Sequence, residues 1–85
     1  ELQALVRKVA TRVLGGYKST AYCNNSLRGK VYSDIQHQLK REFGVERYEA
    51  IKRSQLGQAK EILSSYKAPL ILVQEIQLEN RQIAI

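Results

Sequence analysis

Residues 26–45 read SLRGKVYSDIQHQLKREFGV, and this stretch decides the fold of the 85-residue chain. Its large apolar side chains recur at every fourth position, namely Leu27, Val31, Ile35, Leu39 and Phe43. Each step of four residues turns by about 40° around an α-helix, so these side chains wind slowly across one broad face. The spacing predicts a helix over residues 26–43.

Both ends of this predicted helix carry the residues that typically begin and end helices. Asn25 or Ser26 is expected to be the N-cap, because a short side-chain oxygen accepts a hydrogen bond from an amide of the first turn. At the other end Gly44 precedes the hydrophobic residue Val45. This order is typical of a Schellman-type ending, in which glycine takes the left-handed conformation and the next residue folds back on the last turn.

Two more helices are predicted from apolar periodicity. In residues 2–14 the apolar side chains recur at spacings of three and four, and Gly15 with its neighbouring glycine ends the segment. Residues 55–66 show the same spacing after Ser54, which is the expected N-cap. The main body of the chain is therefore expected to be helical.

The connections between these helices are less regular. Residues 17–25 are rich in Ser, Thr and Asn and have no helical or strand period, so we expect a loop that holds at most one helical turn. In the second connection Val45, Tyr48 and Ile51 fall three apart, which predicts a single buried turn.

The C-terminal segment is compatible with two structures. The run Leu70–Val73 and the apolar residues 82–85 flank a polar turn at residues 79–81, an arrangement that favours a β-hairpin. A helix that begins at Pro69 is the alternative. The predicted fold class is thus mainly α, a small bundle of three main helices and a short helical turn, with either a hairpin or a helix at its C-terminal end.

Length and composition exclude several classes of protein. We expect a single domain over residues 1–85, with a helical body (1–67) and an apolar tail (68–85), cut from a longer intracellular protein. One cysteine and one histidine are too few for an internal disulfide or a zinc site. The longest apolar run is far shorter than the ~20 residues of a membrane-spanning helix. No catalytic motif is present, so we expect no enzyme, no metal and no cofactor.

The charge is concentrated in the body. The chain has 14 Lys and Arg residues and 8 Asp and Glu residues, and the tail holds one of the basic and two of the acidic side chains. A basic body favours nucleic-acid binding. The candidate DNA-binding residues are Arg28, Lys30, Arg47, Lys52 and Arg53. The alternative is a solvated surface with ion pairs such as Glu49–Arg53, and with Asp34 and His37 as a surface pair rather than a catalytic dyad.

The apolar tail is the candidate surface for a protein partner. Its expected contact residues are Leu70, Leu72, Ile76 and Leu78, which would pair as strands or pack as a helix. The alternative is that the tail completes the core of the monomer.

One ordered series of residues resembles the C-terminal domain family of phage antirepressor and phage regulatory proteins. The series comprises Val31-Tyr32-Ser33-Asp34-Ile35, Leu39-Lys40, Phe43-Gly44-Val45, Tyr48, Ile51-Lys52-Arg53, Ala59 and Ile62-Leu63, and Ser19-Thr20-Ala21-Tyr22 fits the preceding loop. The resemblance covers residues 27–66. It implies a prophage-encoded regulator of the bacterial cytoplasm that joins a separate N-terminal domain to this module, and it carries over no catalytic residue.

Two functions are therefore expected. The first is a non-enzymatic, antirepressor-like regulatory module that binds a protein partner, either a repressor or a second copy of itself. The second is a DNA-binding module that contributes to transcription regulation, with the basic residues on phosphates and a C-terminal hairpin as a wing.

Overall fold

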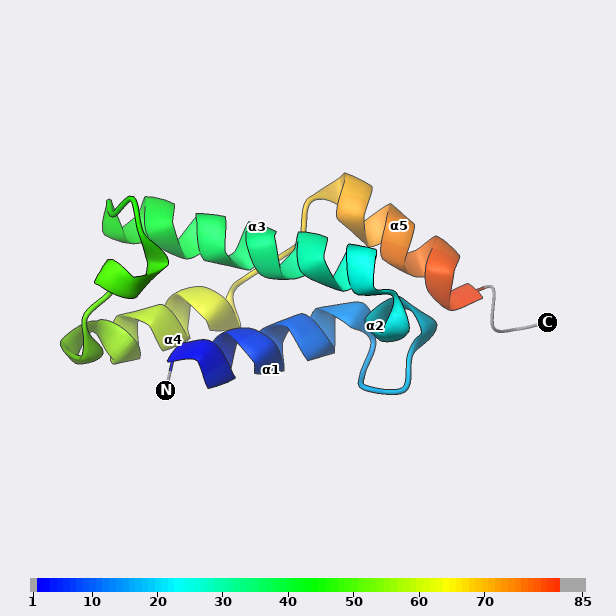
Figure 1. The fold of residues 1–85 in the computed structure, drawn as a ribbon, viewed down its shortest axis with the longest axis horizontal. Helices are drawn as coiled ribbons and strands as arrows, with labels where there is room; N and C mark the ends of the chain where they lie inside the picture. Colours follow the sequence, from blue (N-terminus) through cyan, green and yellow to red (C-terminus); the bar gives the residue numbers. More distant parts are fainter. Residues whose placement is uncertain (1, 82–85) are drawn as a thin grey trace.

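The computed structural model describes residues 2–81, and all of the regular structure in this range is helical. Figure 1 shows an elongated bundle, about 47 Å long and 21 Å wide. The elements in chain order are α1 (Leu2–Leu14), α2 (Thr20–Cys23), α3 (Asn25–Phe43), the 3₁₀ turns η1 (Tyr48–Ala50) and η2 (Arg53–Gln55), α4 (Leu56–Ser64) and α5 (Leu70–Arg81).

The long helix α3 lies at the centre of the bundle. Helices α1 and α4 pack together along one side of α3, and α5 crosses its other side, where it also contacts α2 (Figure 1). The predicted apolar face of α3 is the core: Val31, Ile35 and Leu39 are completely buried and Leu27 nearly so. The four-residue period of the sequence is confirmed as the packing face of this helix.

The predicted C-terminal end of α3 is confirmed, whereas the predicted N-cap, Asn25 or Ser26, is wrong. The N-cap is Asn24, whose side-chain oxygen accepts a hydrogen bond from the Leu27 amide at 3.1 Å. Gly44 has a φ of 65°, and the Val45 amide donates to the Lys40 carbonyl at 3.0 Å, which is the Schellman geometry. The loop before α3 contains the helical turn α2, and the Ser19 hydroxyl caps it by accepting from the Tyr22 amide.

The predicted C-terminal β-hairpin is wrong, because residues 70–81 form the helix α5. The first hydrogen bond runs from the Val73 amide to the Pro69 carbonyl at 3.0 Å, so Pro69 begins the helix as in the alternative prediction. The expected second strand, residues 82–85, lies outside the described residues. Without the first strand of a hairpin, the winged arrangement expected for DNA binding has no wing.

Tyr66 joins the segment after α4 to the centre of α3. Its side chain is buried, and its hydroxyl donates a hydrogen bond to Oδ2 of Asp34 at 2.5 Å. Burial raises the pKa of Tyr66 well above its usual value of 10.0, and the hydrogen bond and negative charge of Asp34 raise it further. The folded protein therefore keeps this proton at a pH where the unfolded chain loses it.

Replacing Tyr66 by Phe is expected to change how stability depends on pH. Below pH 10 the native protein should be more stable than Tyr66→Phe by about 1 kcal/mol, the value of one hydrogen bond. Above pH 10 the unfolded chain ionises first, so the native protein should lose about 1.4 kcal/mol per pH unit relative to the variant. Urea unfolding of both proteins between pH 7 and about pH 11 measures this difference, and a difference that does not change with pH would contradict it.

Candidate functional site

Exposed aliphatic side chains gather on α5. Four large hydrophobic side chains in residues 2–81 are strongly exposed, and three of them are Leu70 (72% exposed), Ile71 (66%) and Leu78 (61%). At about 100° per residue, these three positions fall within a sector of about 100° on the helix. We call this surface the outer face of α5. The fourth exposed side chain, Tyr17 (65%), lies in the turn after α1.

The opposite face of α5 belongs to the core. Leu72 and Ile76 are only 7% and 6% exposed and pack in the same cluster as the buried residues of α3. The four residues predicted to bind a partner are therefore divided: Leu70 and Leu78 lie on the outer face, and Leu72 and Ile76 inside the domain. Sequence reasoning missed Ile71, which helical spacing would have grouped with Leu78.

Asn80 connects the C-terminal end of α5 to α1 and α2 by hydrogen bonds. Its side-chain oxygen accepts a hydrogen bond from the Ala21 amide at 2.8 Å, and its Nδ2 donates to the Leu14 carbonyl at 3.1 Å. A Cβ atom at Gly15 would lie 3.0 Å from that Nδ2, and Gly15 also has a φ of 101°. A glycine at this position thus allows the close approach of Asn80.

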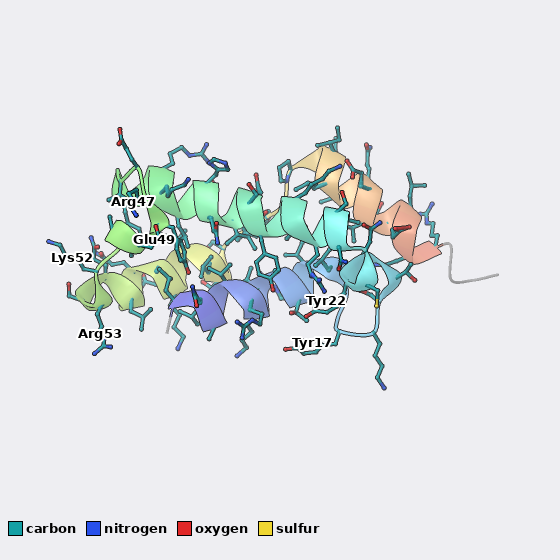
Figure 2. All side chains as sticks on the ribbon, viewed as in Figure 1. Tyr17, Tyr22, Arg47, Glu49, Lys52 and Arg53 are labelled. Atoms are coloured by element: carbon teal, nitrogen blue, oxygen red, sulfur yellow. The ribbon has the colours of Figure 1, made fainter. Side chains whose placement is uncertain are left out.

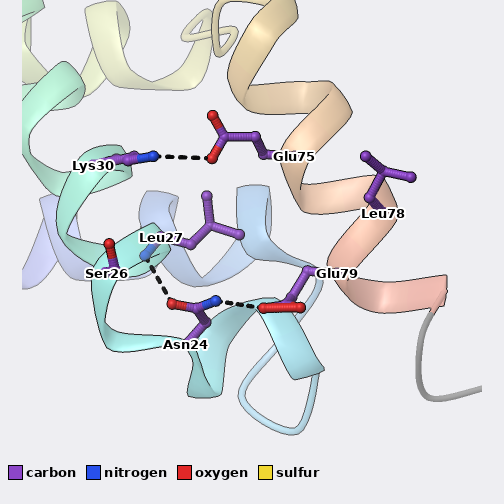
Figure 3. A pocket seen from close by; sticks show the side chains of 7 residues that line it. All are labelled: Asn24, Ser26, Leu27, Lys30, Glu75, Leu78 and Glu79. Carbon is purple, nitrogen blue, oxygen red and sulfur yellow. Dashed lines mark hydrogen bonds and ion pairs between the residues drawn. The ribbon is translucent and has the colours of Figure 1, made fainter.

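Two further polar contacts tie α5 to the first turns of α3, and Figure 3 shows them on either side of a shallow hollow of about 240 Å³. Glu75 pairs with Lys30 at 3.1 Å, and Glu79 accepts a hydrogen bond from the Asn24 side chain. Because both carboxylates already have partners in the chain, the hollow offers little to a charged ligand. These contacts fix the orientation of α5, with Leu78 beside the hollow (Figure 3).

The five candidate DNA-binding residues are not brought together. Arg28 and Lys30 lie in the first turns of α3, whereas Arg47, Lys52 and Arg53 lie at the opposite end of the molecule (Figure 2). The length of α3, about 1.5 Å per residue over 19 residues, separates the two groups. Most of α3, from Arg28 to Phe43, lies between the two groups in the sequence.

The two groups also differ in their partners. The Arg28 guanidinium lies 5.1 Å from the centre of the Tyr22 ring and donates to the Asn25 side chain at 2.7 Å. Lys30 is paired with Glu75. At the other end, Lys52 and Arg53 are exposed around η2. Arg28 thus has part of its guanidinium occupied by neutral partners, and the charge of Lys30 is balanced by Glu75, so both are less available to a phosphate.

Neither of the two predicted surface pairs forms among the described residues. Within residues 2–81 no ion pair joins Glu49 to Arg53, because the two residues lie on separate 3₁₀ turns rather than on one helix. Asp34 accepts its hydrogen bond from Tyr66, 32 residues away in sequence, rather than from His37. Helical spacing in the sequence thus did not identify either partner.

The described residues contain no cluster of three or more His, Cys, Asp or Glu side chains that could hold a metal ion. Cys23 is a free, exposed thiol at the end of α2. None of the helices in residues 2–81 is both long enough and apolar enough to cross a membrane.

The structure thus defines a small helical domain with an exposed apolar helix face and a divided set of basic residues. The family model of the ORF6C domain matches residues 1–76, from α1 into α5. The chain therefore belongs to the ORF6C domain family, a C-terminal domain found in phage antirepressor and regulatory proteins. The resemblance seen over residues 27–66 is confirmed and extends further in both directions. No curated protein and no solved structure matches the chain.

Proposed function

We propose that this chain is a non-enzymatic, antirepressor-like module that acts in the bacterial cytoplasm by binding a protein, either a repressor or a second copy of itself. The outer face of α5 is the observation that supports this function most strongly. A phage regulatory role follows from membership in the ORF6C domain family. Protein binding is the more specific part of the proposal, and the exposed side chains of α5 support it.

The outer face has the properties of a docking helix. Full burial of one aliphatic side chain contributes about 1.5–3 kcal/mol, so three on one face supply several kcal/mol toward association. A helix can present such a face to a groove or to a second helix with anchors about two turns apart, as Leu70 and Leu78 are. The same helix is held rigidly by Asn80 and Glu75, so little ordering is needed when a partner binds.

Replacing the outer face by polar side chains is expected to abolish binding without unfolding the domain. The variant Leu70→Gln, Ile71→Gln, Leu78→Gln keeps residues that favour a helix. We expect its self-association, or its binding to the repressor of the same phage, to weaken by about tenfold or more, because the buried apolar area is lost. Sedimentation equilibrium and biolayer interferometry with that repressor measure the two forms of binding.

The matched control is Tyr17→Gln, which removes the other strongly exposed hydrophobic side chain from a different element. Both variants should change the free energy of unfolding by no more than about 0.5–1 kcal/mol, because each replaced side chain is mainly in solvent. The proposal fails if the chain neither self-associates nor binds the repressor, or if the triple variant binds as well as the original protein.

DNA binding is the weaker candidate. Arg47, Lys52 and Arg53 at one end of the domain provide the observation that favours it. With Arg28 and Lys30 engaged elsewhere, three of the five candidate DNA-binding residues remain together, which is a small footprint for phosphates. We therefore propose protein binding as the main function.

A further inference from the structure

Helices α1 and α4 run side by side in the same direction (Figure 1). Two hollows with apolar side chains lie along them. One hollow of about 350 Å³ is lined by the apolar side chains of Leu5, Val9 and Leu63. A second hollow, of about 530 Å³, follows one turn earlier on the same helices, where Leu2 and Leu56 line it. We call these two hollows together the α1–α4 groove.

The edges of the α1–α4 groove are positively charged. Lys8 and Arg12 from α1 and Lys60 from α4 line the first hollow, and Lys52 and Arg53 line the second. None of the described residues that line either hollow is acidic. In residues 2–81 the one ion pair joins Lys30 to Glu75 on the other side of α3, so the lysines and arginines of the groove have no carboxylate partner there.

We propose that the α1–α4 groove binds an amphipathic helix of a protein partner, in which Asp or Glu residues flank an apolar face. The apolar floor favours aliphatic or aromatic side chains of the bound helix. The unpaired cations at the edges of the groove favour carboxylates on either side of those apolar side chains. From Leu2 to Val9 the groove follows α1 for about 10 Å, which is the length of two helical turns. It therefore accommodates anchor side chains at positions i, i+3 or i+4, and i+7 of the bound helix.

The apolar floor argues against nucleic acid as the occupant. Proteins bind the phosphate backbone through charged and polar side chains and backbone amides. The floor of the groove is instead lined by apolar side chains such as Leu5 and Leu63, which would face solvated phosphates. Helices α1 and α4, whose side chains line the groove, lie on the side of α3 away from α5 (Figure 1). This second interface is therefore independent of the outer face of α5, and one domain can use both surfaces at the same time.

The test uses two synthetic peptides of about 20 residues, because isolated helices shorter than about 12–15 residues are marginal in water. Both carry leucines at helical spacing, and Glu residues flank the leucines in one peptide and Lys residues in the other. Fluorescence anisotropy of the labelled peptides measures binding to the whole chain at low salt. We expect the Glu peptide to bind at least about tenfold more tightly than the Lys peptide, and to weaken as salt is added.

The residue-level test compares Lys8→Glu with Arg7→Glu. The two substitutions make the same change of charge on adjacent residues of α1, but Arg7 lines a different hollow with Gln3 and Val6. We expect Lys8→Glu to weaken binding of the Glu peptide by about tenfold, and Arg7→Glu by no more than about twofold. A thermal melt establishes that both variants are folded.

Three results would overturn this proposal. The first is equal binding of the two peptides, or no binding of either. The second is an equal loss from Arg7→Glu and Lys8→Glu, which would indicate a general effect of net charge. The third is displacement of the Glu peptide by duplex DNA whose own binding is weakened by Lys8→Glu, which would identify the groove as a nucleic-acid surface. None of these results bears on the outer face of α5, which is tested by its own variant.

Discussion

A chain that ends at Pro69 is expected to be largely unfolded at room temperature. Removal of α5 takes Leu72 and Ile76 out of the core and exposes the apolar surface of α3 beneath them. Two buried aliphatic side chains contribute about 3–6 kcal/mol. The net stability of a domain of this size is about 4–13 kcal/mol, so the loss removes much or all of it.

Circular dichroism during urea or thermal unfolding measures this effect. The matched control is the outer-face variant, in which α5 remains but its exposed side chains are polar, and this control should stay folded. If the chain ending at Pro69 unfolds at the same temperature as the whole chain, α5 is not part of the core. Because α5 has two faces, deletion alone does not separate a structural role from a binding role, and point substitutions do.

Replacing Asn80 by Ala is expected to destabilise the domain by about 1–3 kcal/mol. The substitution leaves the Ala21 amide without its partner, and an unsatisfied group that is shielded from water costs about 1–3 kcal/mol. The Leu14 carbonyl loses its bond from Asn80 but keeps the one from the Ser19 hydroxyl. The same change frees the C-terminal end of α5. Hydrogen exchange of the α5 amides should therefore accelerate more than exchange in α3.

Gln77→Ala is the control for this prediction, because Gln77 is an exposed residue of the same helix. It should change the free energy of unfolding by no more than about 0.5 kcal/mol. Equal stability of Asn80→Ala and Gln77→Ala in urea unfolding would show that the contacts of Asn80 with α1 and α2 do not hold α5 in place.

The central helix was the part of the fold that the sequence predicted best. Leu27 to Leu39 repeat every four positions over several turns, and local signals at both ends agree with that period. Gly44 and Val45 form the expected ending, since it depends only on neighbouring residues. Where a long apolar period and the signals at the helix ends agree, the helix can be predicted without knowledge of its tertiary contacts.

The C-terminal segment was ambiguous because four consecutive apolar residues satisfy both a buried strand and a helix. In the fold, Leu72 and Ile76 lie one turn apart and are buried against α3, whereas Leu70 and Ile71 are exposed. The polar residue Asn80 then fixes the helix through contacts more than 50 residues away in sequence. Partners so far apart in the sequence produce no local sequence pattern, so these contacts could not be predicted.

The candidate site was predicted in part for the same reason. Composition directed attention to the apolar C-terminal segment, but only the helical geometry separates the exposed Ile71 and Leu78 from the buried Leu72. For the basic residues, sequence order placed Arg28 and Arg53 in one set, and the length of α3 puts them at opposite ends. The α1–α4 groove joins residues from two distant segments, so it emerges only from the packing.

The central claim is that α5 holds the domain together with one face and binds a protein with the other. The most direct measurement is a methyl NMR titration of the labelled chain with its protein partner, either excess unlabelled chain or the repressor of the same phage. We predict changes at the methyl groups of Leu70, Ile71 and Leu78, and much smaller ones at Leu72 and Ile76. Changes confined to other helices, or no changes with either partner, would contradict the claim.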